Sequence, residues 1–345
     1  MKTITNKKIL FICGREKGYT RNKILIKKLK GQKNKLTVIS SPQKSFIRRQ
    51  TDIIFKMLRQ FPEKNKFEIV FVGFYGYLIV PLAKILYFKK PLFFDAFVST
   101  YETMKEDLAK LDQLPSPLKE ISKFIFKDKG GLKIFYLLDK LSLHLSTKIF
   151  IDTLAHKKYF VKTYCLPLEK IKVEYVNYDD EVFIPQKTPN KKNKKTFLVF
   201  YYGTNQALQG IPTILRAAKI CQRNNPKVQF LLAGPIKKNH QKLISNLKLE
   251  NTKFINWISY KNLPLEIARA DLCLGGHFGS TPKAKRVIAG KTYQFLAMRK
   301  PTIVGKNKAN KELRNWSEWI KVKSLVHPCR MNNPRDLANK ILGLF

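Results

Sequence analysis

Short apolar runs alternate with longer segments of helical periodicity along the first half of the chain. The runs predict five strands, at 8–13, 36–40, 69–73, 91–97 and 148–152. The segments between them, such as the basic stretch RNKILIKKLKG from Arg21, have the length of helices. This alternation is typical of a parallel sheet covered by helices.

Residues 67–88, FEIVFVGFYGYLIVPLAKILYF, are almost long and apolar enough to span a bilayer. Their apolar pattern changes period midway, and Gly73, Gly76 and Pro81 interrupt it. A buried strand at 69–73, a glycine loop and a helix that begins near Pro81 explain the pattern better. We therefore expect a cytoplasmic protein, or one bound peripherally to the cytosolic face of a membrane.

The polar, proline-bearing segment PQKTPNKKNKK, residues 185–195, interrupts the alternation and predicts a linker. Beyond it, strands are expected at 196–202, 228–233, 253–257, 271–275 and 301–305. Helices are expected from Pro212 and at 238–247, 263–270 and 291–298. The predicted organisation is an N-terminal domain, a linker and a C-terminal domain, at 1–185, 186–195 and 196–345.

Two doubly wound domains predict where a ligand binds. Open parallel sheets bind ligands at the carboxyl ends of their strands. If two such sheets face each other, the cleft between the domains is the expected active site.

The chain is strongly basic, with 67 lysines and arginines against 24 aspartates and glutamates and a formal net charge of +43. Such a charge attracts polyanions or an anionic membrane surface, although a general lysine-rich bias gives the same count. No zinc-finger, RRM or glycine–arginine pattern accompanies it, so a specific nucleic-acid partner is not expected. The basic amphipathic segment from Ser116, SPLKEISKFIFKDKGGLKIFYLL, fits either an anionic lipid surface or an ordinary surface helix.

The cysteines and acidic residues argue against a metal site. The five cysteines are scattered without a CxxC pair, and no histidine lies at metal-ligand spacing. This pattern predicts free thiols in a reducing compartment. The sequence also lacks a DxD pair that could hold a divalent metal, so we expect no metal cofactor.

The segment GGHFGSTPKAKRVIAGKTYQF, residues 275–295, is the richest in candidate chemistry. Two glycines end a strand, a polar loop follows, and Lys291 opens a helix. Lys291 and Gln294 lie three residues apart on one helix face, so the ammonium can meet a diphosphate while the amide reaches deeper. Without a metal, Arg286, Lys291 and helix-end N–H groups would have to neutralise a leaving diphosphate.

Glycines follow the first two strands of the C-terminal domain. Gly203 precedes the helix from Pro212, and the amino end of a helix favours a phosphate. A glycine turn is also common at such a position without any ligand. Gly234 ends the strand in LLAGP. The strand end around Ile258 either presents backbone groups to a flat nucleobase or is a plain sheet edge.

The N-terminal domain has its own polar residues at strand ends. Asp95 ends the strand in FFDAF, where a carboxylate can orient or deprotonate an acceptor hydroxyl, or cap the next element. His156 follows the strand at 148–152 and is either an ordinary helix residue or a catalytic one. Gly14 and Arg15 follow the first strand and would line the same cleft.

The order and spacing of several segments resemble a GT-B glycosyltransferase similar to glycosyltransferase family 4. The segments are KPLFFDAFVSTYETMKED, LLDKLSLHLSTKIFIDTLAHKKYF, VEYVNYDDEVFIP, YYGTNQALQGIPTILRAA, LLAGP, FINWISYKNLPLEIARADLCLGG and KTYQFLAMRKPTIVG, and together they span nearly the whole chain. The resemblance implies an α/β protein with two Rossmann-like doubly wound domains facing a cleft. It leaves open a C-terminal helix that crosses back to the N-terminal domain.

The resemblance also implies that a nucleoside-diphosphate sugar binds the C-terminal domain and the acceptor binds mainly the N-terminal one. The candidates for the acceptor side are then Gly14, Arg15, Asp95 and His156. Gly203 would then face the diphosphate. The loop after it carries Thr204, Asn205 and Gln209 instead of the family's arginine and lysine.

Two further positions depart from the family's pattern. Gln294 falls where the second glutamate of the family binds the donor ribose, and Arg286 falls where the first glutamate contacts the sugar. Our hypothesis is that Arg286 and Lys291 have taken over the cationic role that the loop after Gly203 lacks.

We expect transfer of a sugar, without a metal, to a lipid-linked or cell-envelope glycan at the cytosolic face of a membrane. The resemblance implies that the reaction retains configuration. If configuration is inverted instead, Asp95 is the expected base. The missing glutamates favour a second interpretation, a catalytically degenerate GT-B scaffold or binding protein.

Overall fold

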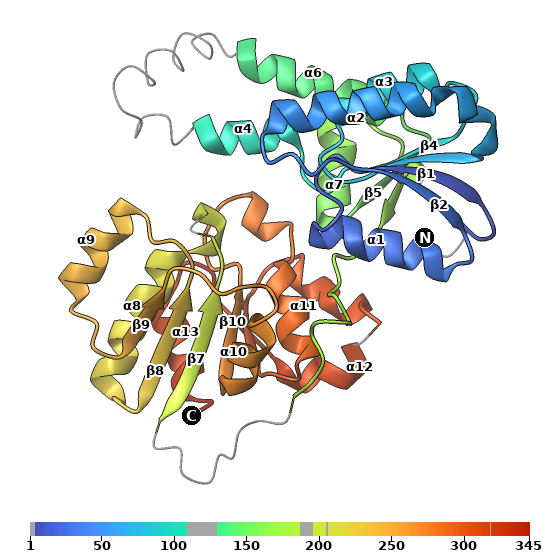
Figure 1. Cartoon of the computed structure of the whole chain (residues 1–345). Coiled ribbons are helices and arrows are strands. Elements are labelled where there is room, and N and C mark those ends of the chain that lie inside the picture. The colour runs from blue at the N-terminus through green and yellow to red at the C-terminus, as the bar shows by residue number, and fades with distance from the viewer. Residues whose placement is uncertain (1–3, 109–129, 187–195, 205, 318) are drawn as a thin grey trace. The chain divides into compact units, whose positions relative to one another are not determined.

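The computed structural model describes residues 4–108, 130–186, 196–204, 206–317 and 319–345. They form two compact units (Figure 1). The first unit comprises Met1–Asp152 and Lys157–Glu174, and the second comprises Thr153–His156 and Tyr175–Phe345. Most of the predicted linker and much of the basic amphipathic segment from Ser116 lie outside the described residues.

The first unit is built on a six-stranded parallel sheet in the order β2-β1-β3-β4-β5-β6. Its strands are β1 (Lys8–Ile12), β2 (Lys35–Ile39), β3 (Ile69–Val72), β4 (Leu92–Asp95), β5 (Lys148–Ile151) and β6 (Ile171–Val173). The five predicted strands are confirmed, because near-continuous apolar runs are typical of strands buried on both faces. The pattern does not predict β6, which has only three residues at the edge of the sheet.

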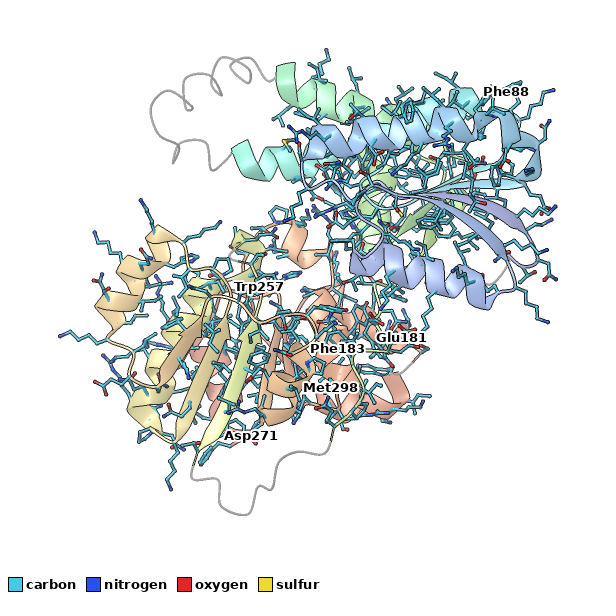
Figure 2. All side chains as sticks on the ribbon, viewed as in Figure 1. Phe88, Glu181, Phe183, Trp257, Asp271 and Met298 are labelled. Atoms are coloured by element: carbon cyan, nitrogen blue, oxygen red, sulfur yellow. The ribbon has the colours of Figure 1, made fainter. Side chains whose placement is uncertain are left out.

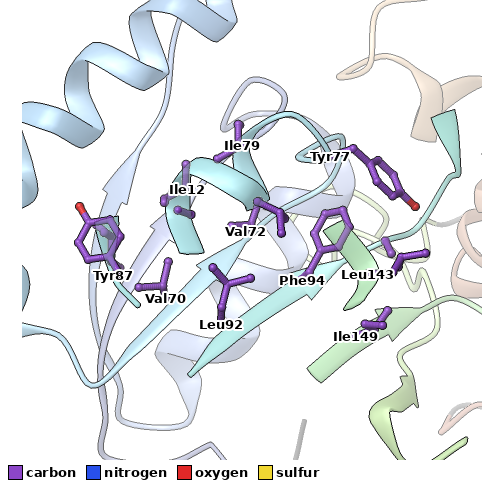
Figure 3. Packing of buried hydrophobic residues seen from close by; sticks show 14 of the residues in the cluster. Ile12, Val70, Val72, Tyr77, Ile79, Tyr87, Leu92, Phe94, Leu143 and Ile149 are labelled. Atoms are coloured by element: carbon purple, nitrogen blue, oxygen red, sulfur yellow. The ribbon is translucent and has the colours of Figure 1, made fainter. Parts of the chain in front are cut away.

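Helices cover both faces of this sheet (Figure 1). They are α1 (Thr20–Gly31), α2 (Phe46–Gln60), α3 (Ile79–Leu86), α4 (Thr100–Leu108), α6 (Gly130–Leu145) and α7 (Leu154–Tyr164), with short 3₁₀ helices at Phe61–Lys66 and Leu168–Lys170. α1 packs on one face, where Leu25 and Leu29 join the cluster around Phe71. The opposite face carries α2, α3 and α6. Figure 3 shows part of the buried cluster on this face, with Leu143 near Phe94 and Tyr87 near Val70.

The apolar stretch at residues 67–88 folds as β3 followed by a glycine loop and α3, as its change of period predicts. No helix in the described ranges combines the length and the apolar character that crossing a bilayer requires.

The second unit repeats the architecture, with a parallel sheet in the order β12-β11-β10-β7-β8-β9. Its strands are β7 (Phe197–Tyr202), β8 (Val228–Ala233), β9 (Thr252–Ile255), β10 (Leu272–Gly276), β11 (Thr302–Gly305) and β12 (Val326–Cys329). The five predicted strands are again confirmed. β12 is not predicted because it contains Pro328, and proline is tolerated there since β12 lies at the edge of the sheet.

The helices of the second unit also form two layers. They are α8 (Ile211–Asn224), α9 (Lys238–Leu247), α10 (Leu263–Arg269), α11 (Gly290–Ala297), α12 (Trp319–Val322) and α13 (Pro334–Leu342), with 3₁₀ helices at Ala207–Gln209, Lys283–Lys285, Asn310–Asn315 and Lys323–Leu325. The C-terminal helix α13 packs on α8, because Leu337 and Ile341 belong to the same buried cluster as Ile214. This packing keeps α13 within the second unit, and it does not cross back to the first.

Residues 175–185 belong to the second unit, whereas the sequence predicts them in the N-terminal domain. Phe183, labelled in Figure 2, is buried in a cluster with Phe200 and Phe295. Trp316 Nε1 also donates to Asn177 Oδ1 at 3.3 Å. The change of unit therefore precedes the polar linker by about ten residues, a distance that composition does not indicate.

Candidate active site

Two glycines close the carboxyl ends of β7 and β8. Gly203 has a φ of +154°, and a Cβ there would lie 3.0 Å from Lys291 Nζ. Gly234 has a φ of +140°, and a Cβ there would lie only 2.0 Å from the Gly203 carbonyl oxygen. Neither position accepts a side chain without rearrangement. The ends of both strands are therefore bare backbone, at the edge where parallel sheets bind ligands.

Lys291 lies in the first turn of α11 and is only 6% exposed. Its Nζ donates to the Gln209 side-chain oxygen at 2.7 Å and to the Tyr202 carbonyl at 3.0 Å. The ammonium also lies 3.9 Å from the ring centroid of Tyr201. Burial holds the pKa of Lys291 well below its usual 10.5. Since a buried cation is stabilised by an anion, this lysine is suited to meet a negatively charged ligand.

Gln209 holds the Lys291 side chain in place. Its Oε1 accepts from Lys291 Nζ and, at 3.3 Å, from the Tyr201 hydroxyl. Gln209 ends a 3₁₀ helix just before Gly210, which has a φ of +70° and is the N-cap residue of α8. The loop after β7 therefore contacts the Lys291 side chain through the side-chain amide of Gln209.

Gln294 lies one turn along α11 from Lys291, and both side chains are buried, as their spacing predicts. The Tyr202 hydroxyl donates to Gln294 Oε1. The structure therefore brings Gly203, Lys291 and Gln294 together around the end of β7. Their roles toward a donor stay predictions.

His277 is a residue of this region that the sequence pattern does not single out. It follows β10, is 3% exposed, and its Nδ1 has no hydrogen-bond partner among the described residues. Burial, with smaller contributions from Lys291 and Lys283, lowers its pKa to about 3. The imidazole is therefore neutral at physiological pH. Its position directly after the two glycines of the GGH sequence was the available signal.

The other predicted donor residues are placed less tightly. Arg286 follows the 3₁₀ helix Lys283–Lys285, is half-buried, and its carbonyl accepts from Thr153 Oγ1 at 2.5 Å.

Thr204, in the loop after β7, is exposed. Ile258 is half-buried and packs on the same cluster as Tyr202, whereas its neighbour Trp257 is 74% exposed (Figure 2). Asn205 lies outside the described residues.

In the first unit, Asp95 forms a buried pair with Arg21. Arg21 Nη2 donates to Asp95 Oδ1 at 2.8 Å and Nε donates to Oδ2 at 3.0 Å, and neither side chain is more than 1% exposed. Burial raises the pKa of the Asp95 carboxyl, against the opposing effect of the guanidinium. A catalytic base has to reach the hydroxyl that it deprotonates. The geometry therefore favours a structural role for Asp95 over the predicted catalytic one.

The remaining acceptor-side candidates also have structural contacts. A Cβ at Gly14 would lie 2.4 Å from the Tyr75 carbonyl carbon, so close backbone packing requires this glycine. Arg15 pairs with Glu16 at 3.0 Å and lies over the Tyr19 ring.

His156 is completely buried, and it groups with the second unit and not with the first. Its N–H donates to Thr153 Oγ1 at 3.0 Å.

Metal-ligand groups and cavities add no further site. Among the described residues, no group of three or more histidine, cysteine, aspartate or glutamate side chains is placed to hold a metal ion. A cavity of about 620 Å³ lies in the first unit between β2 and α2, where Lys56 and Arg59 contribute to its lining. None of the predicted site residues lines it.

Residues 183–282 match the family model of glycosyl transferases group 1. The match includes Gly203, Gly234 and His277. It ends before Lys291 and Gln294, and so before the segment in which the sequence departs from the family's carboxylates. A comparison with curated proteins gives no match.

Several solved structures resemble the chain over nearly its whole length. HepE of Anabaena in complex with UDP is 15% identical, with a TM-score of 0.60 and coverage of 97% of this chain and 89% of that one. Sucrose-phosphate synthase of Thermosynechococcus elongatus is 11% identical, with a TM-score of 0.62 and coverage of 98% and 90%. UDP-GlcNAc 2-epimerase of Neisseria meningitidis, bound to UDP-GlcNAc, is 15% identical, with a TM-score of 0.53 and coverage of 98% and 91%. These likenesses confirm the predicted fold of two Rossmann-like domains.

Proposed function

We propose that the chain is a glycosyltransferase that moves a sugar from a nucleoside-diphosphate sugar to a lipid-linked or cell-envelope glycan. The match of residues 183–282 to glycosyl transferases group 1 and the GT-B fold support this proposal. The observation that carries this proposal is the buried Lys291 ammonium beside Gly203, at the carboxyl end of β7. A cation that is desolvated and held by Gln209 is ready to pair with a diphosphate.

Uridine nucleotides are the donor class we propose first. HepE was solved with UDP and with UDP-glucose, and the Neisseria epimerase was solved with UDP-GlcNAc. In this chain, Gly203 and Gly234 supply the bare strand ends where a diphosphate can approach the backbone. Gln294 can hydrogen-bond a ribose hydroxyl through its amide group, although it offers no negative charge.

The proposed chemistry needs no metal. Lys291, Arg286 and helix-end N–H groups stabilise the charge that develops on the leaving diphosphate. In a retaining reaction, the leaving phosphate itself accepts the proton of the acceptor hydroxyl. The Asp95 carboxylate is hydrogen-bonded to Arg21, which supports the retaining reaction. An inverting reaction would need a base that is free to reach the acceptor hydroxyl.

The proposed location is the cytoplasm or the cytosolic face of a membrane, where a lipid-linked acceptor is presented. The net charge of +43 supports contact with an anionic surface.

A catalytically degenerate scaffold is the second candidate. It is favoured by Arg286 and Gln294, which stand where the resemblance places carboxylates. Such a protein would bind a nucleotide without turning over its sugar. Incubation of the purified protein with UDP-glucose and UDP-GlcNAc separates the two candidates, because only the enzyme releases UDP by transfer or slow hydrolysis.

A thermal-shift screen against UDP, GDP, ADP and CMP tests the donor site. We expect UDP to raise the melting temperature, since a ligand stabilises the state that it binds. Lys291→Ala should abolish most of this shift and lower kcat by roughly 10²–10³-fold, the usual cost of losing a group that stabilises developing charge.

Lys242→Ala is the matched control, because Lys242 is an exposed lysine on α9 in the same unit. It should leave both the UDP shift and kcat unchanged. An undiminished UDP shift in Lys291→Ala would contradict the assigned role of Lys291.

A further inference from the structure

The outer surface of the helix layer formed by α2, α3 and α6 is unusually apolar. Seventeen large hydrophobic side chains are exposed in the described ranges, and ten of them lie on or beside these three helices. We call these ten residues the apolar face: Phe46, Ile47, Phe55, Leu58, Leu78, Ile85, Phe88, Ile134, Leu137 and Leu141. Scattered exposed apolar residues are normal, but a contiguous group marks an interaction site.

The apolar face is separate from the core side of the same helices. On α6, Ile134, Leu137 and Leu141 are spaced by three and four residues, so they share one face, and each is at least 50% exposed. On the opposite side of α6, Leu143 is completely buried. α2 shows the same division, because Phe55 is 66% exposed while Ile53 is buried.

The three helices form one continuous surface. α2 contacts α3, and α3 contacts α6. All three pack against the same buried cluster on one face of the sheet of the first unit (Figure 1). Phe88, labelled in Figure 2, lies at the end of α3 on this layer. The apolar face therefore spans three neighbouring helices.

Basic side chains are interleaved with the apolar face. They are Arg48, Arg59, Lys84, Lys89, Lys90, Lys133 and Lys140. Two of these lysines lie close to Phe88: Lys84 Nζ donates to the Phe88 backbone carbonyl at 3.3 Å, and Lys89 Nζ lies 5.6 Å from the Phe88 ring centroid. The carboxylate of this layer on α2, Asp52, pairs with Lys56 at 2.9 Å. The surface thus combines apolar area with a net positive charge.

We propose that the apolar face docks the protein on an anionic lipid bilayer. Interleaved apolar and basic side chains suit the headgroup region, where the apolar groups enter the acyl boundary and the cations meet lipid phosphates. A second copy of this chain is the less favourable occupant, since it would bring another charge of +43 against the same basic residues. The inference rests on the proposed function, because a lipid-linked acceptor would be reached from this docked position.

Co-flotation of the full chain with vesicles tests the docking surface. The vesicles are phosphatidylcholine alone and phosphatidylcholine mixed with phosphatidylglycerol, at physiological and at raised salt. Wild-type protein should bind the anionic vesicles and keep part of its binding at raised salt, because apolar contacts are not screened. With Ile85→Ser, Phe88→Ser and Ile134→Ser together, the partition coefficient should fall at least about tenfold.

Leu168→Ser, Leu265→Ser and Ile320→Ser together form the matched control, because these three side chains are at least 54% exposed but lie off the helix layer. The control should bind like the wild type. Equal binding by the apolar-face variant and the wild type would overturn the proposal, since it would assign all binding to the general charge. A variant that binds vesicles normally but loses self-association in light scattering would overturn it in favour of a second copy.

UDP thermal shifts of the same proteins keep this proposal distinct from the proposed function. The apolar-face variant should show the wild-type UDP shift. A normal UDP shift without vesicle binding would overturn the docking surface alone. Vesicle binding that depends on the apolar face, without any nucleotide shift, would support docking and contradict the proposed donor.

Discussion

At the scale of single residues, the burial of Lys291 makes the second unit sensitive to pH. Burial lowers the pKa of this lysine well below 10.5. Between that lowered pKa and 10.5, the unfolded chain binds more protons than the folded one, so this group makes the folded state more stable as pH rises through the window. A bound diphosphate acts in the opposite direction, because it favours the protonated ammonium and raises the pKa.

Nucleotide binding should therefore take up protons at Lys291. At pH values above both the second phosphate pKa of about 6 and the lowered pKa of Lys291, we expect UDP binding to take up as much as one proton, and UDP affinity to fall as pH rises further. Calorimetric titration in two buffers of different ionisation enthalpy measures the number of protons. His277 is neutral before UDP binds, since its pKa is about 3.

Lys291→Gln is the control for this linkage, because it keeps a hydrogen-bonding side chain without a titratable group. It should bind UDP more weakly and without proton uptake. Tight UDP binding by the wild-type protein that stays proton-neutral at every pH up to 10.5 would rule out a diphosphate beside Lys291.

At the scale of elements, the Arg21–Asp95 pair joins α1 to the end of β4. Arg21 Nη1 also donates to the Glu174 carbonyl at 2.8 Å, so the pair links three segments of the first unit. Removal of one partner of a buried pair leaves an uncompensated charge, which typically costs about 3–5 kcal/mol. Asp95→Asn should therefore lower the free energy of unfolding of the first unit by roughly this amount, measured by urea denaturation.

A double variant shows whether the pair or the charge matters. Arg21→Met with Asp95→Leu removes both charges, and it should be less destabilised than Asp95→Asn. Glu63→Gln, which breaks the exposed Lys66–Glu63 pair, should change stability little. If Asp95→Asn folds normally but loses all transfer activity, the catalytic role predicted from the sequence would be restored.

The sequence predicts elements well and side-chain partners poorly. Ten strands and the helices between them follow from apolar periodicity, because strands buried on both faces leave a strong local signal. The edge strands β6 and β12 leave none. Contacts such as Arg21–Asp95 join residues 74 positions apart, and Lys291–Gln209 joins residues 82 apart. No local pattern contains such pairs, so the structure was needed to change Asp95 from a candidate base into a partner of Arg21.

At the scale of the whole molecule, each unit has its own sheet and its own buried clusters. The first unit is held by the clusters around Phe71 and Phe94, and the second by those around Leu274 and Phe295. The proposed donor-binding residues Gly203, Lys291 and Gln294 all belong to the second unit. A donor nucleotide should therefore stabilise one unit directly.

Differential scanning calorimetry should accordingly show two unfolding transitions. UDP should raise the melting temperature of only one of them. At a UDP concentration about 100 times Kd, the bound unit gains about 2.7 kcal/mol, and Lys291→Ala should remove this gain. Asp95→Asn identifies the other transition, because it should lower the melting temperature of the first unit alone. The contrary result would be a single transition whose melting temperature is raised by UDP and lowered by Asp95→Asn. It would show that the two cores unfold together, and that the stability of the donor site depends on the unit that carries the apolar face.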